Sequence, residues 1–224
     1  MAPMVEPTRK QEPPRAGTPT PRRPLYQRLG RRGLYVAGGS VLLLGLVAWG
    51  VVLSGKRKAE YSARALDQAR AIAESGNLPQ ASAALQQVIQ SYPGTDAAQE
   101  AVLTLNQVRL INGQSELAAV NLRDFLSTSH DARYRAAAEA LLGAALENAT
   151  RNAEAAAAYQ RAAAAATVDY LKAEYLVDAG RAYRAAGKVA EAETAYRDVV
   201  QKYPKTTSMT EAEVRLSELT DGKL

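Results

Sequence analysis

The chain contains no cysteine, one histidine and one tryptophan among its 224 residues. Without cysteine it cannot form a disulfide, a thiolate metal site, a thiol nucleophile or a lipid-modified cysteine anchor. The single histidine, His130, lies in a polar connector at 127–131, and we interpret it as a loop residue. Phosphate-loop, dinucleotide-binding and nucleophile-elbow motifs are also missing. We therefore expect no enzyme activity, no cofactor, no metal and no small-molecule substrate.

Acidic residues are scarce at the N-terminal end and in excess elsewhere. Residues 1–58 hold 11 Lys and Arg against two Glu, whereas residues 59–224 hold 17 Lys and Arg against 21 Asp and Glu. The basic pI of ≈ 9.4 thus comes from one end of the chain. Because the remainder is mildly acidic, it is a poor match for the phosphate backbone, and we expect no nucleic-acid partner.

The first 33 residues are predicted to be a disordered, basic, proline-rich tail. Seven of the ten prolines fall here among Arg, Thr and Gln, which leaves little apolar surface to bury. The pairs Arg22-Arg23 and Arg31-Arg32 could be read as a nucleic-acid-binding arm or a twin-arginine export signal. We interpret them as a positive-inside topology signal, because no polar-hydrophobic consensus follows either pair.

Residues 34–53 form a run of 20 residues without a charge. As a helix this run spans about 30 Å, the thickness of a bilayer's hydrocarbon core. A cleaved signal peptide would need a shorter apolar stretch and a small-x-small site, so we predict one transmembrane helix followed by a linker at 54–61. The predicted anchor residues are Leu34, Tyr35, Leu42, Leu43, Leu44, Leu46, Val47, Trp49, Val51, Val52 and Leu53.

From residue 59 onward the sequence repeats with a period of 37. Gly76, Gly113 and Gly187 share one phase of this period, and Thr150 stands at the remaining place. Apolar residues fall at helical spacing, and in the clearest unit they predict one helix over 172–186 and a second over 189–203. Other positions keep the same phase: Ala81, Ala118, Ala155 and Ala192, then Leu85, Leu122, Tyr159 and Tyr196.

This pattern resembles the tetratricopeptide repeat, in which a bulky residue, a Leu-Gly pair, an aromatic residue, an alanine, a second aromatic residue and a proline recur. The resemblance implies an all-α fold, a solenoid of about four helix-turn-helix repeats over 62–224 with a C-terminal capping helix. The family period is about 34 residues, so we place the three extra residues in the connectors. The matching residues of the last unit are Leu176, Ala179, Gly180, Tyr183, Ala192, Tyr196 and Pro204.

Three details of packing follow from this alignment. Gly180 is expected to let the backbones of its two helices touch. Ser208 and Glu211 are expected to form a capping box at the start of the closing helix. Val214 and Leu216 are expected to face inward from that helix.

The resemblance also implies a concave groove, lined by the first helix of each unit, that binds other proteins. Three arginines in this groove either meet carboxylates or C-termini of a partner or are simply exposed to solvent. Carried onto this sequence, the groove residues are Leu66, Arg70, Gln107, Leu110, Asn148, Arg181 and Arg184.

The whole architecture is similar to the ancillary subunit of the bacterial Sec translocon. Turns at 92–95 and 203–206, both Tyr-Pro-x-Thr, also resemble envelope proteins of the outer-membrane assembly and Tol-Pal coordinator type. These resemblances imply an inner-membrane protein that assists protein export or envelope assembly through its groove, its transmembrane helix and the lipid bilayer. A permanent structural subunit of a respiratory or photosynthetic complex remains the alternative.

Eight basic residues precede the uncharged span, so the N-terminus is predicted to be cytoplasmic and the repeats periplasmic. Alkaline phosphatase fused after Leu224 should therefore be active, and β-galactosidase at the same place should be inactive. The reverse pair of activities would refute this topology.

Overall fold

The computed structural model describes residues 31–129 and 131–220, together with only a few of the side chains between residues 31 and 53. Most of the predicted tail, residues 1–30, and His130 lie outside the described residues. The described residues are helical apart from turns and connectors. Their helices are α1 (Arg31–Glu74), α2 (Leu78–Ser91), α3 (Asp96–Ile111), α4 (Ser115–Thr128), α5 (Ala132–Asn148), α6 (Asn152–Ala165), α7 (Asp169–Ala185), α8 (Val189–Lys202) and α9 (Ser208–Leu219).

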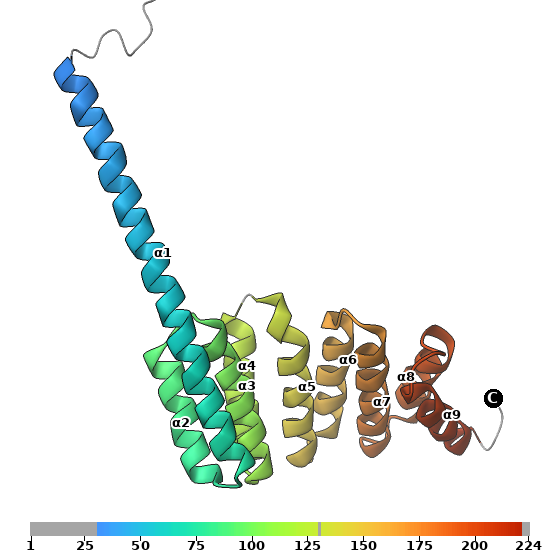
Figure 1. The fold of residues 1–224 in the computed structure, drawn as a ribbon. Helices are drawn as coiled ribbons and strands as arrows, with labels where there is room; N and C mark the ends of the chain where they lie inside the picture. Colours follow the sequence, from blue (N-terminus) through green and yellow to red (C-terminus); the bar gives the residue numbers. More distant parts are fainter. Residues whose placement is uncertain (1–30, 130, 221–224) are drawn as a thin grey trace, which may run out of the picture. The chain divides into compact units, whose positions relative to one another are not determined.

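The chain divides into two units, residues 1–52 and residues 53–224. Within the second unit the helices follow one another in chain order, each beside the next (Figure 1). The C-terminal part of α1 with α2, then α3 with α4, α5 with α6 and α7 with α8, correspond to the four predicted repeats, and α9 closes the row. This confirms the all-α solenoid. The first helix of the last repeat begins three residues earlier than predicted, at Asp169.

The turn inside each repeat has a left-handed residue at one fixed phase. Gly76, Gly113 and Gly187 have φ values of 85°, 73° and 76°. Thr150, at the same phase in the third repeat, has a φ of 57°. This conformation crowds the Cβ of any residue other than glycine. The 37-residue period of the sequence therefore marks the position of the left-handed turn residue in each repeat.

The predicted membrane anchor, residues 34–53, falls in the first unit apart from Leu53. Its backbone belongs to α1, and of its side chains Trp49 and Val52 are described as exposed. Among the residues that the structure describes, no helix is both long enough and apolar enough to cross a membrane.

The core of the repeats consists of two hydrophobic clusters. The first joins α1, α2 and α3 and includes Leu66, Leu85 and Leu105. The second runs from α4 to α9 and includes Leu122 and Tyr196, with partly buried residues of α3 packed against it. Alanine occupies many of the fully buried positions, which lets neighbouring helices pack closely. The boundary between the clusters lies between α3 and α4, inside the second repeat.

Two glycines of first helices face tyrosine rings of second helices. A Cβ added at Gly180 would lie 2.6 Å from the ring of Tyr196, and one at Gly143 would lie 2.7 Å from the ring of Tyr159. Real carbon atoms do not approach so closely. The small residue was predicted correctly, but an aromatic ring, rather than the partner backbone, fills the space beside Gly180.

The first two repeats have a different pair of residues at these two packing positions. By the 37-residue phase, Ala69 and Asn106 replace the glycines, and the residues at the tyrosine places are Leu85 and Leu122. A glycine in the first helix thus occurs together with a tyrosine in the second, and a larger residue with a leucine. The two positions complement each other in volume.

Two expectations for the closing helix were wrong. Thr207 is the residue before α9, and no side chain caps the helix, because Ser208 already lies inside it. Val214 is 53% exposed, whereas Leu216 is buried as expected. Ala212, four residues before Leu216, is the second buried residue of α9, so the inward face is rotated from the predicted one.

The complementarity of Gly180 and Tyr196 predicts a measurable coupling. Gly180→Ala should destabilise the array by about 1–3 kcal/mol, because the added methyl group overpacks the buried ring. In the Tyr196→Leu background the same change should cost clearly less, as measured by urea unfolding of the four proteins of a double-mutant cycle. Equal costs in both backgrounds would show that the ring is not what requires the glycine.

Candidate protein-binding face

One face of the repeats is formed by the first helices. Along each of them, residues at spacings i, i+4, i+7 and i+11 share a side and are exposed or half-buried. We call these residues the first-helix stripes. They are Ala63, Asp67, Arg70 and Glu74 on α1; Glu100, Thr104, Gln107 and Ile111 on α3; Ala137, Leu141, Ala144 and Asn148 on α5; and Glu174, Asp178, Arg181 and Ala185 on α7.

Ion pairs connect neighbouring first helices across this face. Arg70 on α1 pairs with Glu100 on α3 at 2.8 Å. Arg181 on α7 pairs with Glu147 on α5 at 3.0 Å, and Arg184 on α7 pairs with Glu218 on α9 at 2.6 Å. Arg70 and Glu100 belong to the stripes themselves, and α3 also packs against α5. The first helices are therefore neighbours along this face.

The three arginines predicted to meet a partner are thus already paired with carboxylates of the same chain. Their partners lie 30 or 34 residues away in sequence. Such a separation is close to one repeat, so a scan for opposite charges one period apart could have found them. Because most of these side chains are half exposed, each pair contributes little stability by itself.

The other predicted groove residues lie in different environments. Leu66 is only 3% exposed and belongs to the first hydrophobic cluster, so a partner cannot reach it. Leu110 is partly buried against the second cluster. Gln107, in the middle of α3, and Asn148, at the end of α5, are exposed. Only the last two are available as single side chains on this face.

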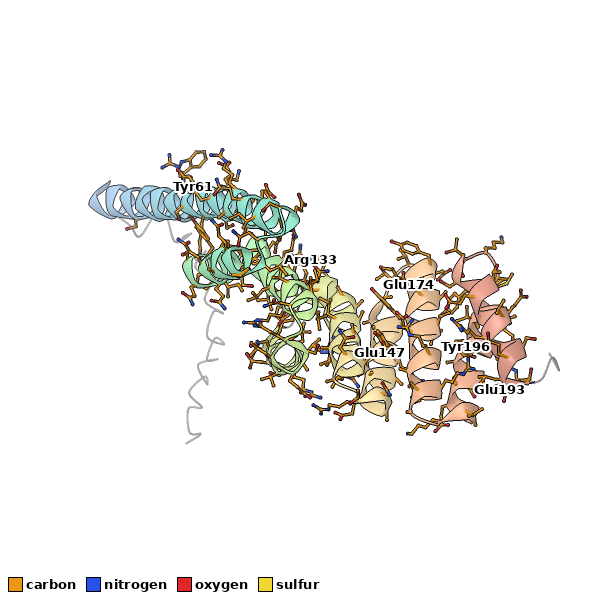
Figure 2. The ribbon with its side chains drawn as sticks, turned by 90° about the horizontal axis from the view of Figure 1, so that it is seen from below. Tyr61, Arg133, Glu147, Glu174, Glu193 and Tyr196 are labelled. Atoms are coloured by element: carbon orange, nitrogen blue, oxygen red, sulfur yellow. The ribbon has the colours of Figure 1, made fainter. Side chains whose placement is uncertain are left out.

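A partly buried charge network lies where α5, α6 and α7 meet. Glu147, labelled in Figure 2, accepts hydrogen bonds from the Tyr159 hydroxyl at 3.0 Å and from Arg181. Asp178 pairs with Arg181 at 2.9 Å. Burial nevertheless raises the pKa of Asp178 from 3.8 to about 6, and Arg181 only partly opposes this effect. Desolvation also raises the pKa of Tyr159.

The stripes also carry carboxylates that the chain does not neutralise. Asp67, Glu74 and Glu174 are exposed, and among the described residues none of them has an ion-pair partner (Glu174 is labelled in Figure 2). The unpaired charge of the stripes is therefore negative, whereas Arg70, Arg181 and Arg184 have carboxylate partners within the chain.

Among residues 31–129 and 131–220, no three His, Asp or Glu side chains are placed to hold a metal ion. Every buried side-chain nitrogen or oxygen of this part of the chain has a hydrogen-bond partner.

Comparison with protein families decides what kind of array this is. A model of the tetratricopeptide repeat-like domain matches residues 50–177, more than half of the chain. The chain belongs to this family. A second model, of the tetratricopeptide repeat itself, matches residues 174–206, which cover most of the fourth repeat of this tetratricopeptide-like protein. The fold is that of a protein-interaction module.

Solved structures show the same fold at low sequence identity. Two crystal structures of MamA protein share 23% and 24% identity with this tetratricopeptide-like chain, with TM-scores of 0.58 and 0.57. They cover 72% and 69% of this chain and 82% and 84% of their own. A tetratricopeptide repeat protein from Parabacteroides merdae is 12% identical, with a TM-score of 0.57, over 71% of this chain and 60% of its own. No curated protein matches the sequence.

The raised pKa of Asp178 predicts an unusual pH dependence of stability. Because the folded-state pKa lies above the unfolded-state value, this group favours folding below pH 4 and loses that contribution as the pH rises to about 6. Asp178→Asn should therefore gain stability relative to the wild type between pH 4 and pH 7, by about 1–2 kcal/mol. Urea unfolding at both pH values measures the difference. If the difference in unfolding free energy between Asp178→Asn and the wild type is the same at both pH values, the raised pKa of Asp178 is contradicted.

Proposed function

We propose that this protein is a membrane-anchored, non-enzymatic interaction module whose first-helix stripes bind a partner protein. The observation that carries the proposal is the row of first-helix stripes, to which α1, α3, α5 and α7 each contribute exposed or half-buried residues. A row of rigid helices presents such a surface at little entropic cost of binding, because its backbone is already ordered.

The charge of this surface favours a partner segment with basic residues. Asp67, Glu74 and Glu174 are exposed without an ion pair, whereas Arg70 and Arg181 are neutralised by Glu100 and Glu147. Complementary charge steers association and discriminates between partners more than it adds affinity. The apolar Ile111, 73% exposed on the stripe of α3, offers a place for a hydrophobic contact beside these charges.

The proposed anchor is the uncharged segment 34–53, and the proposal rests on the sequence. Twenty residues without a charge are enough to span a bilayer as a helix, and the basic excess lies on the N-terminal side. This distribution supports an inner-membrane protein with a cytoplasmic N-terminus and a periplasmic repeat array. In that position the module would assist protein export or envelope assembly.

Two matched double variants test the binding face in the full-length protein. Glu74→Gln with Glu174→Gln removes two stripe carboxylates. Glu191→Gln with Glu213→Gln removes two carboxylates that lie off the stripes, on α8 and α9, and have no ion pair. We expect only the first pair to reduce partner recovery in mild-detergent purification. Both double variants should have a free energy of unfolding within about 0.5 kcal/mol of the wild-type value.

Equal recovery with the two double variants would contradict the proposed face. If both recover the partner fully while deletion of residues 34–53 abolishes recovery, the association runs through the anchor. The protein would then be a permanent structural subunit of a membrane complex, the alternative raised by its sequence.

A further inference from the structure

The second repeat differs from the others in how its two helices meet. α3 and α4 are packed against each other less extensively than α5 and α6 or α7 and α8, and a cleft of ≈ 470 Å³ lies beside them. This cleft is bounded by α2 and α4, the second helices of two successive repeats, with α3 between them. It is therefore separate from the first-helix stripes.

Two polar residues of the second repeat occupy packing positions of the tetratricopeptide pattern. At the place of Asn106 the other repeats have Ala69, Gly143 and Gly180, and at the place of Arg109 they have Ile72, Leu146 and Tyr183. Both Asn106 and Arg109 line the cleft. Polar residues at core positions cost stability unless they are hydrogen-bonded, and departures from a packing pattern are expected at functional sites. Here both substitutions lie next to the same opening.

Asn106 and Arg109 are held in place by a short chain of hydrogen bonds. Asn106 is fully buried, donates to the Val102 carbonyl at 2.9 Å and accepts from Arg109 at 3.2 Å. Arg109 is half-buried, and among the described residues no carboxylate lies within ion-pair distance of it. Burial lowers its pKa, which agrees with a guanidinium that lacks an anionic neighbour.

The rest of the cleft combines apolar walls with amide groups. Ile89, Val102, Leu105 and Phe125 form its apolar part. Side-chain amides can both donate and accept hydrogen bonds, as a peptide backbone requires. The polar lining residues besides Asn106 and Arg109 are Gln86, Gln90, Asn121, Asp124 and Thr128.

The cleft continues into a second one of ≈ 400 Å³, which shares Ile89, Val102, Phe125 and Thr128 with it. On α3 the combined lining reaches from Ala98 to Arg109, a rise of about 16 Å along the helix. An extended peptide of about four or five residues has this length.

We propose that this groove binds a short extended segment of a partner protein, with an acidic side chain at Arg109 and a neighbouring apolar side chain against Phe125. The half-buried cation without a carboxylate selects the acidic group, because charge-assisted hydrogen bonds to a guanidinium are stronger than neutral ones. Asp124 is exposed in the same cleft and has no ion-pair partner among the described residues, so it disfavours a second acidic residue. This site lies beyond the first-helix face proposed above, and neither depends on the other.

The test uses the full-length protein in detergent and three fluorescein-labelled peptide amides, Gly-Ser-Leu-Asp-Ser-Gly, Gly-Ser-Leu-Asn-Ser-Gly and Gly-Ser-Ser-Asp-Ser-Gly. Anisotropy titration should show tightest binding for the Leu-Asp peptide. Arg109→Gln should weaken that binding about tenfold or more. Arg135→Gln, which removes an exposed arginine of α5 without an ion pair, is the matched control and should bind normally.

A second variant blocks the groove and leaves its charged residues unchanged. Asn121→Trp, on the half-exposed side of α4, should block the opening and abolish binding while circular dichroism shows an unchanged helix content. A photoreactive benzophenone in place of the peptide's leucine should crosslink to lining segments of the two clefts, residues 86–94, 98–109 or 121–129. Equal binding to the Arg109 and Arg135 variants, no preference for the Asp peptide, crosslinks elsewhere, or no binding to the wild type would each overturn the proposal.

Discussion

In the third and fourth repeats, a tyrosine ring of the second helix lies in the space that a side chain on the first helix would otherwise fill. The ring of Tyr196 leaves no room for a Cβ at Gly180, and Tyr159 does the same at Gly143. This contact sets how close the paired helices come, and so where the next repeat can pack. The alanines around it serve the same end, because they add little bulk between helices whose spacing the ring determines.

Among the described residues, the ion pairs between repeats also connect only adjacent units. Apart from the ion pairs on the first helices, Arg133 at the start of α5 pairs with Asp96 at the start of α3, a separation of 37 residues. Arg151 before α6 pairs with Glu116 in α4. Each of these contacts joins a repeat to its neighbour and no further. Stability in such an array is a sum of local terms, which is why polar substitutions confined to one repeat can be tolerated.

Much of the fold could be predicted from the sequence because its evidence is periodic. The phase of Gly76, Gly113 and Gly187 located the turns, and even Thr150 at the fourth place adopts the left-handed conformation. Leu66 and Val214 were misassigned because a period of 37 gives the phase of a residue but not the rotation of its helix. The carboxylate partners of Arg181 and Arg184 were missed because they belong to neighbouring repeats.

The candidate binding surfaces were harder to foresee for a related reason. The 37-residue phase shows that Asn106 and Arg109 depart from the pattern of the other repeats, but only the packing of α2, α3 and α4 shows that both border one opening. Free and neutralised charges also look alike in a sequence. Glu174 and Glu147 are both glutamates of first helices, and only the second has an arginine beside it.

The boundary between the two hydrophobic clusters has a mechanical consequence. The fully buried apolar residues of α3 belong to the first hydrophobic cluster. Its Val102, Leu103 and Leu110 are only partly buried, and they pack against the second cluster. We expect tension applied along the row of helices to open this boundary first, because no fully buried residue of α3 belongs to the second cluster. Helices α4 to α9 share one core cluster, so we expect them to stay together while α1 to α3 separate from them.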